Sequence, residues 1–214
     1  MNGSLILASA SPRRADLLRM IGCRLEVITS HVDEATDASL TAAQTATELA
    51  ERKARNVSRN HPDRIVIGAD TVVTIDDQIL GKPADRDEAD TMLRLLSGAT
   101  HQVLTAVTLL HGSSDQGSDD RVQQILAKTD VTFRHLGDLE INRYLDSDEP
   151  YDKAGAYGIQ GRASLFAERI DGCFYNVVGF PVTQFWIALE QITNCRATDY
   201  CTQRPSPDLL SLNG

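Results

Sequence analysis

The sequence contains few cysteines, and none of them is placed for metal binding. Its four cysteines are Cys23, Cys173, Cys195 and Cys201; they form no C-x-x-C pair, and no histidine lies beside them at zinc-ligand spacing. This pattern argues against the common zinc modules and favours free thiols in a reducing cytoplasm. The five histidines are dispersed along the chain, so we interpret them as structural.

Other signatures are absent as well. No stretch is long enough and apolar enough to span a bilayer, so we expect no membrane association. The sequence has neither a P-loop nor a G-x-S-x-G nucleophile elbow, and no cysteine has the setting of a nucleophile. These absences argue against P-loop nucleotide binding and against covalent hydrolysis by serine or cysteine.

Basic residues are also outnumbered by acidic ones. The chain has 21 Lys+Arg against 30 Asp+Glu, which gives a formal net charge of -9. Nucleic-acid polymers and anionic membranes require a broad basic field, so the charge balance argues against both as partners. A small anionic ligand needs only a few local cations and is still compatible with this composition.

The 214 residues read as alternating strand and helix patterns without a linker or an internal repeat. We expect a single α/β domain over residues 1–192 and a loose tail over 193–214. Periodicity predicts strands at 5–8, 24–28, 65–75, 103–110, 131–133 and 165–170. The segment 65–75 can be one strand or two that meet at Gly68-Ala69-Asp70, and the polar segment 111–120 is expected to be a hairpin loop.

Helix signals complete the pattern. Helices are expected at 12–21, 41–59, 85–96, 138–145 and 181–192. Ser11-Pro12 supplies an N-cap and a first-turn proline, and Thr45-x-x-Glu48 and Asp85-x-x-Glu88 are close to capping boxes.

Asp70 is the most informative candidate residue. An ionised carboxylate within a buried β-branched run is costly unless a cation, a metal or hydrogen bonds compensate it. A functional carboxylate and a carboxylate that caps a turn at the strand end explain this position equally well.

A second candidate is the run Ser9-Ala10-Ser11-Pro12-Arg13-Arg14 at an expected helix start. Free backbone N–H groups and the helix dipole favour anions there, and guanidinium groups bind phosphate in a bidentate manner. Two cations in the first turn oppose the dipole unless an anion lies nearby. The alternative is a well-capped helix with solvated arginines.

Weaker candidates follow along the chain. Lys82 is held on a stiff turn by Gly81 and Pro83, Lys53 lies in a charged helical segment, and Glu34 can be a metal ligand or a loop carboxylate. The glycine-spaced loop 152–161 allows close backbone approach to a ligand, and Gln160 offers a donor and an acceptor for a base edge. Each of these taken alone is also explained as ordinary surface structure.

Taken together and in order, these segments resemble the Maf family (septum formation inhibitor Maf-like proteins). The matching stretches cover the chain to about residue 192: LILASASPRRADLLRMIG, VDE at 32–34, ELAERKA at 48–54, VIGADTVV at 66–73, ILGKP at 79–83, MLRLLSGATHQVLTAV at 92–107, SDEPYDKAGAYGIQG at 147–161 and IDGCFYNVVGFP at 170–181.

The resemblance implies a nucleoside triphosphate pyrophosphatase that releases the monophosphate and pyrophosphate. It implies an inosine triphosphatase-like α/β fold, in which helices flank an elongated mixed sheet and a cleft separates two lobes. It also implies a divalent cation, usually magnesium, with manganese or cobalt as substitutes. A homodimer in the cytoplasm is the expected state, with a free nucleotide rather than a nucleic acid as substrate.

The resemblance also implies roles for particular residues. Asp70 would accept the proton of the attacking water and hold metal together with Glu34. Arg13, Arg14, Lys53 and Lys82 would clamp phosphate, with Ser9 and Ser11 lining the same turn. The forms GADT at 68–71 and AYGIQG at 156–161 resemble the dTTP/UTP subgroup, and they tie substrate preference to Arg13, Thr71 and Gln160.

Two alternatives stay open on the sequence. One is the 7-methyl-GTP type of specificity within the same family. The other is a nucleotide-binding regulator of septum formation that hydrolyses slowly, although such a binder has no need of a water-activating acid.

Overall fold

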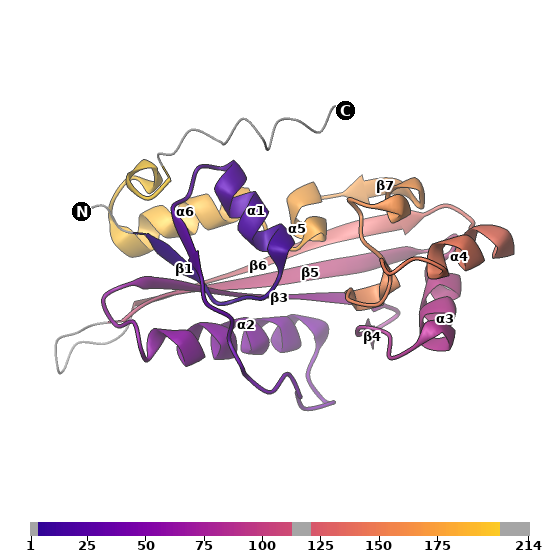
Figure 1. Ribbon diagram of the computed structural model, residues 1–214, viewed down its shortest axis with the longest axis horizontal. Helices are drawn as coiled ribbons and strands as arrows, with labels where there is room; N and C mark the ends of the chain where they lie inside the picture. The colour runs from indigo at the N-terminus through magenta and orange to yellow at the C-terminus, as the bar shows by residue number, and fades with distance from the viewer. Residues whose placement is uncertain (1–3, 113–120, 202–214) are drawn as a thin grey trace.

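The computed structural model describes residues 4–112 and 121–201, which form a seven-stranded mixed sheet with helices on both faces (Figure 1). The strands are β1 Leu5–Leu7, β2 Leu25–Val27, β3 Ile65–Ile75, β4 Gln78–Leu80, β5 Thr100–His111, β6 Arg121–Phe133 and β7 Ala167–Asp171. The α-helices are α1 Pro12–Met20, α2 Ala42–Ser58, α3 Arg86–Leu96, α4 Asp138–Leu145, α5 Phe174–Val178 and α6 Val182–Thr193. Short 3-10 helices cover Ala154–Ala156, Arg162–Leu165 and Ala197–Asp199.

The strand order is β2-β1-β3-β5-β6-β7, with β4 paired to β3 off this path. β1 runs parallel to β2 and β3, whereas β3, β5, β6 and β7 pair in antiparallel fashion. The sequence-based expectation of an α/β fold with an elongated mixed sheet is confirmed. β3 is one continuous strand, so Asp70 lies within a strand and does not cap a turn.

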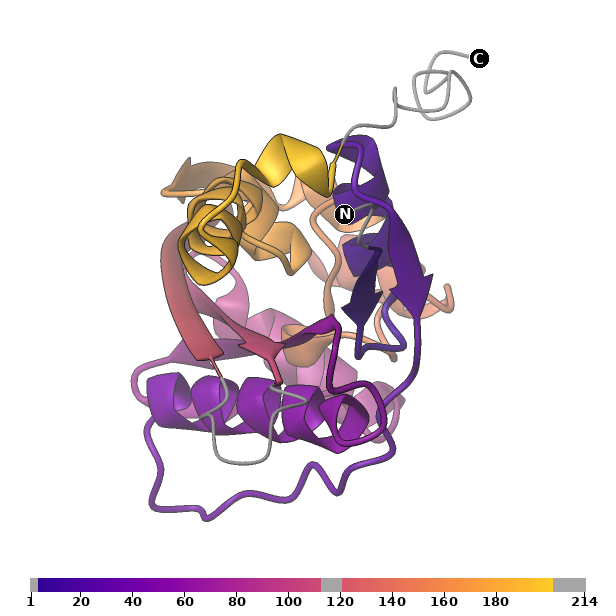
Figure 2. The ribbon, with the colours of Figure 1, turned by 90° about the vertical axis from the view of Figure 1, so that its left-hand side faces the viewer.

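Helices cover the long central strands on opposite sides (Figure 2). α2 packs against β3 and β5, and α6 packs against β5 and β6 from the other face. Because both faces of β3 and β5 are covered, these strands are buried along almost their whole length, and their largely apolar sequences show no strict alternation. None of the described helices combines the length and the apolar character that a membrane span requires.

Three strand predictions were wrong in extent, and one of them concerns β5, which begins at Thr100 rather than at 103. β6 begins at Arg121, ten residues before the expected 131–133. The prediction missed the first half of the strand because this half is largely exposed and carries polar residues that resemble a loop. The strand expected at 165–170 begins at Ala167, and Leu165 belongs to a 3-10 helix. Most of the hairpin loop expected at 111–120 lies outside the described residues.

α2 begins after Thr41, as expected, but its capping box is not the one expected at Thr45 and Glu48. The capping box is formed by Thr41 and Gln44: the Gln44 backbone N–H donates to Thr41 Oγ1 (3.3 Å), and the Thr41 N–H donates to Gln44 Oε1 (2.9 Å). Thr45 is instead a buried residue inside the helix. The helix start predicted at Asp85 is confirmed, since its side chain accepts the Glu88 N–H (2.9 Å).

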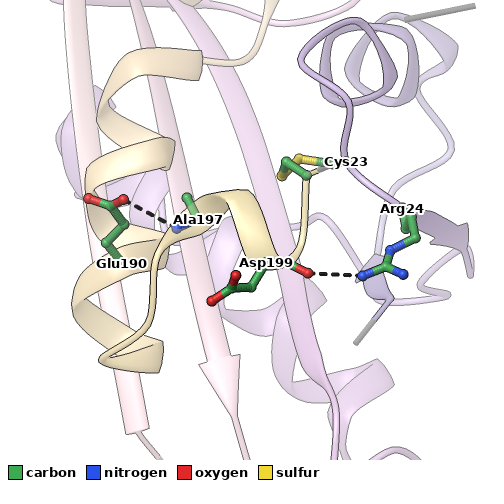
Figure 3. The surroundings of a disulfide bond; sticks show 6 residues. Cys23, Arg24, Glu190, Ala197 and Asp199 are labelled. Carbon is green, nitrogen blue, oxygen red and sulfur yellow. Dashed lines mark hydrogen bonds between the residues drawn. A yellow bond between two sulfur atoms is a disulfide. The ribbon is translucent and has the colours of Figure 1, made fainter. Parts of the chain in front are cut away.

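The first part of the tail is fastened to the body of the protein, which corrects two expectations. Cys23 and Cys201 form a disulfide, so these two thiols are not free, whereas Cys173 and Cys195 are (Figure 3). Around it, Arg24 donates from its side chain to the Asp199 carbonyl (2.9 Å), and the Ala197 N–H donates to Glu190 (3.2 Å). Residues 195–201 are therefore held in place, and residues 202–214 lie outside the described part of the chain.

One glycine sets the distance between α2 and the sheet. A Cβ atom on Gly68 of β3 would lie 2.1 Å from the Ala50 carbonyl oxygen and 2.6 Å from the Ala54 nitrogen, both on the backbone of α2. The helix can approach β3 this closely only because position 68 lacks a side chain. Lys53 belongs to this same turn of α2, so the close approach also brings Lys53 to the strand that carries Asp70.

A buried histidine predicts acid sensitivity of the fold. His101 is 1% exposed, its Nε2 lies 2.8 Å from the Tyr157 hydroxyl, and burial lowers its pKa to about 4. The unfolded chain binds a proton near pH 6.5, so this residue's contribution is complete above that pH and is lost as the pH falls toward 4. We expect His101 to remove up to about 1.4 kcal/mol of unfolding free energy per pH unit in that window.

Urea denaturation at pH 7 and pH 5 measures this effect. His101→Gln, which can still bond Tyr157 but does not titrate, should show a smaller difference between the two pH values than the wild type. His135→Gln, at an exposed position, is the matched control and should behave like the wild type. An unchanged pH dependence in His101→Gln would contradict the assignment.

Candidate active site

All ten residues singled out from the sequence line one cleft of about 990 Å³. They lie in seven segments: the β1–α1 turn, the first turn of α1, the loop after β2, helix α2, strand β3, the turn after β4 and the loop after Ala154–Ala156. In chain order they are Ser9, Ser11, Arg13, Arg14, Glu34, Lys53, Asp70, Thr71, Lys82 and Gln160. The fold therefore brings the expected residues together, although a shared cleft does not assign their roles.

Lys53 joins two of the carboxylates. Its Nζ lies 2.7 Å from Asp70 Oδ1 and 2.7 Å from Glu34 Oε1. Lys53 and Asp70 are 7% and 9% exposed, so the alternative of a solvated lysine on the surface of α2 is excluded. The hydrogen bond from Lys53 lowers the pKa of Glu34, whose side chain is largely exposed. The cleft thus pairs a buried carboxylate with a buried ammonium group at hydrogen-bond distance, which offsets the cost of burying either charge alone.

Arg14 makes its contacts within the protein. It is 9% exposed, and its guanidinium donates to the Gly179 carbonyl (3.0 Å), Ser9 Oγ (3.1 Å), the Ala69 carbonyl (2.8 Å) and Thr71 Oγ1 (2.9 Å). Burial lowers the pKa of Arg14, but a guanidinium group stays protonated in proteins. These contacts tie α1 to β3 and to the turn at Gly179, and the expected place of Arg14 in a phosphate clamp stays a prediction.

Arg13 and Lys82 are more accessible than Arg14. Arg13 is partly exposed and lies 3.6 Å from Asp152 across the cleft, and Lys82 is exposed on the turn after β4. Both side chains are therefore free to approach an anion in the cleft. The cleft lining thus gathers five cationic side chains, and it also holds four carboxylates: Arg13, Arg14, Lys53, Lys82 and Lys153, with Glu34, Asp70, Glu149 and Asp152.

The glycines of the loop 152–161 make room for something other than the ligand that was expected there. A Cβ on Gly161 would lie 2.1 Å from Glu149 Oε1, and one on Gly158 would lie 2.6 Å from Lys153 Cε. These glycines make room for neighbouring side chains of the protein rather than for a ligand. Glu149 also accepts the Arg162 N–H (3.0 Å), so it holds the turn that places the exposed Gln160 at the cleft.

A chain of hydroxyl groups lies behind Thr71. Thr71 and Thr105 are directly opposite each other on β3 and β5, and their Oγ1 atoms are 3.0 Å apart. Thr105 Oγ1 also donates to the Asn176 carbonyl (3.0 Å), and Asn176 itself is fully buried.

Sequence reasoning did not single out Glu149, Thr105 or Asn176. Thr105 and Asn176 lie in runs that read as ordinary core, and Glu149 lies in a polar loop. The one signal available was that all three fall within the family-like stretches.

Comparison with known proteins gives consistent matches over most of the chain. The family model described as Maf-like protein matches residues 4–192. A dTTP/UTP pyrophosphatase of Bacillus pumilus (strain SAFR-032) is 47% identical over 186 residues, covering 87% of this chain and 95% of that protein. The protein of the same name from Alkaliphilus oremlandii (strain OhILAs) is 48% identical over 189 residues, covering 86% and 94%.

A third relative, from Bacillus velezensis, carries the same name and is 46% identical over 191 residues, covering 89% of this chain and 97% of that protein. Among solved structures, the Ham1 protein of Staphylococcus aureus is similar with a TM-score of 0.48 and 12% sequence identity, covering 88% of this chain and 98% of that chain.

Proposed function

Because the chain belongs to the Maf family, we propose that it is a nucleoside triphosphate pyrophosphatase that hydrolyses dTTP and UTP. Water attacks the α-phosphorus, the α–β phosphoanhydride bond breaks, and the products are the nucleoside monophosphate and pyrophosphate. The observation that carries the proposal is the buried Asp70, held by Lys53 in a cleft that Arg13 and Lys82 also line.

Each of these side chains can serve a distinct role in phosphoanhydride hydrolysis. Asp70 accepts the proton of the attacking water, since it is the buried carboxylate of the cleft. Arg13, Lys53 and Lys82 offset the negative charge that accumulates on the phosphate oxygens and the leaving pyrophosphate. No covalent nucleophile is needed, which agrees with the absence of a serine or cysteine elbow in the sequence.

The donor set of the cleft fits a magnesium ion bound largely through substrate. Among residues 4–112 and 121–201, no group of three or more His, Cys, Asp or Glu side chains is arranged to hold a metal. Magnesium commonly takes only one or two carboxylates and completes its shell with phosphate oxygens and water. Glu34 and Asp70, which converge on Lys53 Nζ, supply such a pair, and manganese or cobalt could substitute. The bound cation would neutralise charge on the phosphate oxygens.

A substrate panel tests the proposal. Purified protein with magnesium should release pyrophosphate from dTTP and UTP at least about tenfold faster than from 7-methyl-GTP, as judged by kcat/KM. Faster hydrolysis of 7-methyl-GTP would assign the chain to the other subgroup. Tight nucleotide binding without turnover would instead support a regulatory role in septum formation. The homodimer stays a prediction of the family resemblance, and the cytoplasmic location stays a prediction from the cysteine pattern.

A further inference from the structure

Asn176 is a fully buried polar residue that the proposed mechanism does not use. It lies on the short helix α5, and its side-chain amide donates to the Val103 carbonyl of β5 (2.9 Å) and to Thr129 Oγ1 of β6 (2.9 Å). The two amide hydrogens therefore fasten α5 to two different strands. Buried hydrogen bonds to separate strands fix both the position and the rotation of the backbone that carries the side chain.

Thr129 holds the start of the same helix. Its hydroxyl donates to the Cys173 carbonyl (3.2 Å) and accepts the Cys173 backbone N–H (3.0 Å) as well as the Asn176 amide. A threonine hydroxyl has one hydrogen and two lone pairs, so all of its bonding capacity is used here. α5 is thus held on β6 both at the residue before its first turn and at Asn176.

The C-terminal end of α5 reaches the cleft. The Asn176 carbonyl accepts the Gly179 N–H (2.9 Å), and the Gly179 carbonyl accepts the Nε–H of Arg14 (3.0 Å). Asn176 is therefore two hydrogen bonds away from a guanidinium that lines the cleft. Another acceptor of Arg14 is the carbonyl of Ala69 (2.8 Å), which directly precedes Asp70 in the chain. A displacement of α5 is passed on to this guanidinium.

The orientation of the Arg14 guanidinium matters because little of it is left for a ligand. Arg14 makes four hydrogen bonds within the described part of the chain, and a guanidinium has five N–H groups. A planar fork with so few free donors meets a phosphate oxygen only if its rotation is fixed. Gly179 takes the Nε–H at the base of the fork, so its position helps to set where the remaining donor is directed.

We propose that Asn176 is a positioning residue of this cleft: it seats α5 on the sheet so that Gly179 directs the Arg14 guanidinium at the phosphate groups of a bound nucleotide. The proposal rests on the proposed function for its ligand and on the expected place of Arg14 beside the phosphates. Asn176 Oδ1 has no partner among residues 4–112 and 121–201, and a buried amide oxygen without a donor lowers stability. A positioning role accounts for an asparagine here in spite of that loss.

The chain offers matched variants for a test. Asn176→Leu keeps the size of the side chain but cannot donate, and Thr129→Val removes the hydroxyl that holds α5, which Thr129→Ser restores. Thr108→Val is the matched control on β5, because this buried threonine has an Oγ1 without a partner among the described residues. Ile141→Ala is a control for lost stability alone, since this buried residue of α4 does not line the cleft. Urea denaturation establishes that each variant is folded.

The experiment measures dissociation constants for α,β-imido-dTTP by calorimetry in the presence of magnesium. We expect Asn176→Leu and Thr129→Val to weaken binding by about tenfold or more. Thr129→Ser and the two controls should stay within about threefold of the wild type. Arg14→Lys keeps the charge but lacks the Nε–H that Gly179 accepts. In the Arg14→Lys protein, Asn176→Leu should therefore weaken binding by less than about twofold.

Unchanged affinity in folded Asn176→Leu, no recovery in Thr129→Ser, or equal effects of Asn176→Leu with and without Arg14→Lys would overturn the inference. So would wild-type affinity in Arg14→Lys, equally weak binding in Ile141→Ala, or binding of the analogue by none of the proteins. The Thr129 pair keeps the inference falsifiable if Asn176→Leu does not fold. Pyrophosphate release is scored separately: binding that depends on Asn176 without turnover of dTTP would refute the proposed hydrolysis and leave the inference standing.

Discussion

Replacement of Asp70 with asparagine is expected to lower kcat for pyrophosphate release from dTTP by about a thousandfold, with a much smaller effect on KM. Asparagine keeps the size of the side chain and can still contact Lys53, which lies 2.7 Å from the carboxylate. It cannot accept a proton from water. The loss should therefore fall on the chemical step rather than on nucleotide binding.

Steady-state assays of pyrophosphate release with magnesium measure this effect. Asp16→Asn is the matched control, because Asp16 lies exposed on α1 and pairs with Arg19 at the surface. It should retain wild-type kcat. If Asp70→Asn keeps more than about a tenth of the wild-type kcat, another group activates the water and the assignment of Asp70 is wrong.

Substitution of Gly68 by alanine is expected to destabilise the protein by about 3 kcal/mol or more. The new Cβ would lie 2.1 Å from the Ala50 carbonyl oxygen, and backbone atoms of a packed helix cannot move aside cheaply. α2 would have to withdraw from β3, and Lys53 would be drawn away from Asp70 with it. Activity should therefore fall along with stability.

Chemical denaturation gives the free energy of unfolding, and dTTP turnover gives the effect on the site. Gly81→Ala is the matched control for stability, because a Cβ at Gly81 would meet no heavy atom within 4 Å. Its unfolding free energy should stay within about 0.5 kcal/mol of the wild type. A Gly68→Ala protein as stable as Gly81→Ala would show that α2 is not held by this close approach.

Sequence patterns predicted the central strands better than the edges. β3 and β5 were recognisable because strands covered on both faces become long apolar runs. The first half of β6 was missed because its side chains are mostly exposed, so burial imposes no apolar pattern on it. The Cys23–Cys201 pairing joins residues 178 positions apart, and nothing in local spacing points to it.

The site shows a similar division. Motif resemblance identified ten residues that do line one cleft, because the motifs mark positions where the chain returns to the same place. It did not predict that Arg14 is occupied by internal contacts. Nor did it predict the contact between the Thr71 and Thr105 hydroxyl groups, which depends on the register that sets these two residues opposite each other.

The Cys23–Cys201 bond changes the covalent topology of the chain. It closes a ring that contains Glu34, Lys53, Asp70, Thr71, Lys82 and Gln160, while the segment with Ser9 to Arg14 forms a short branch outside it. A single backbone break anywhere in the ring leaves one covalent molecule, because the two pieces stay joined through sulfur. A break between Arg14 and Cys23 separates Arg13 and Arg14 from the carboxylates that they accompany in the cleft. Glu34 and Asp70 thus differ from Arg13 and Arg14 in their tolerance of chain cleavage, although all four line the same cleft.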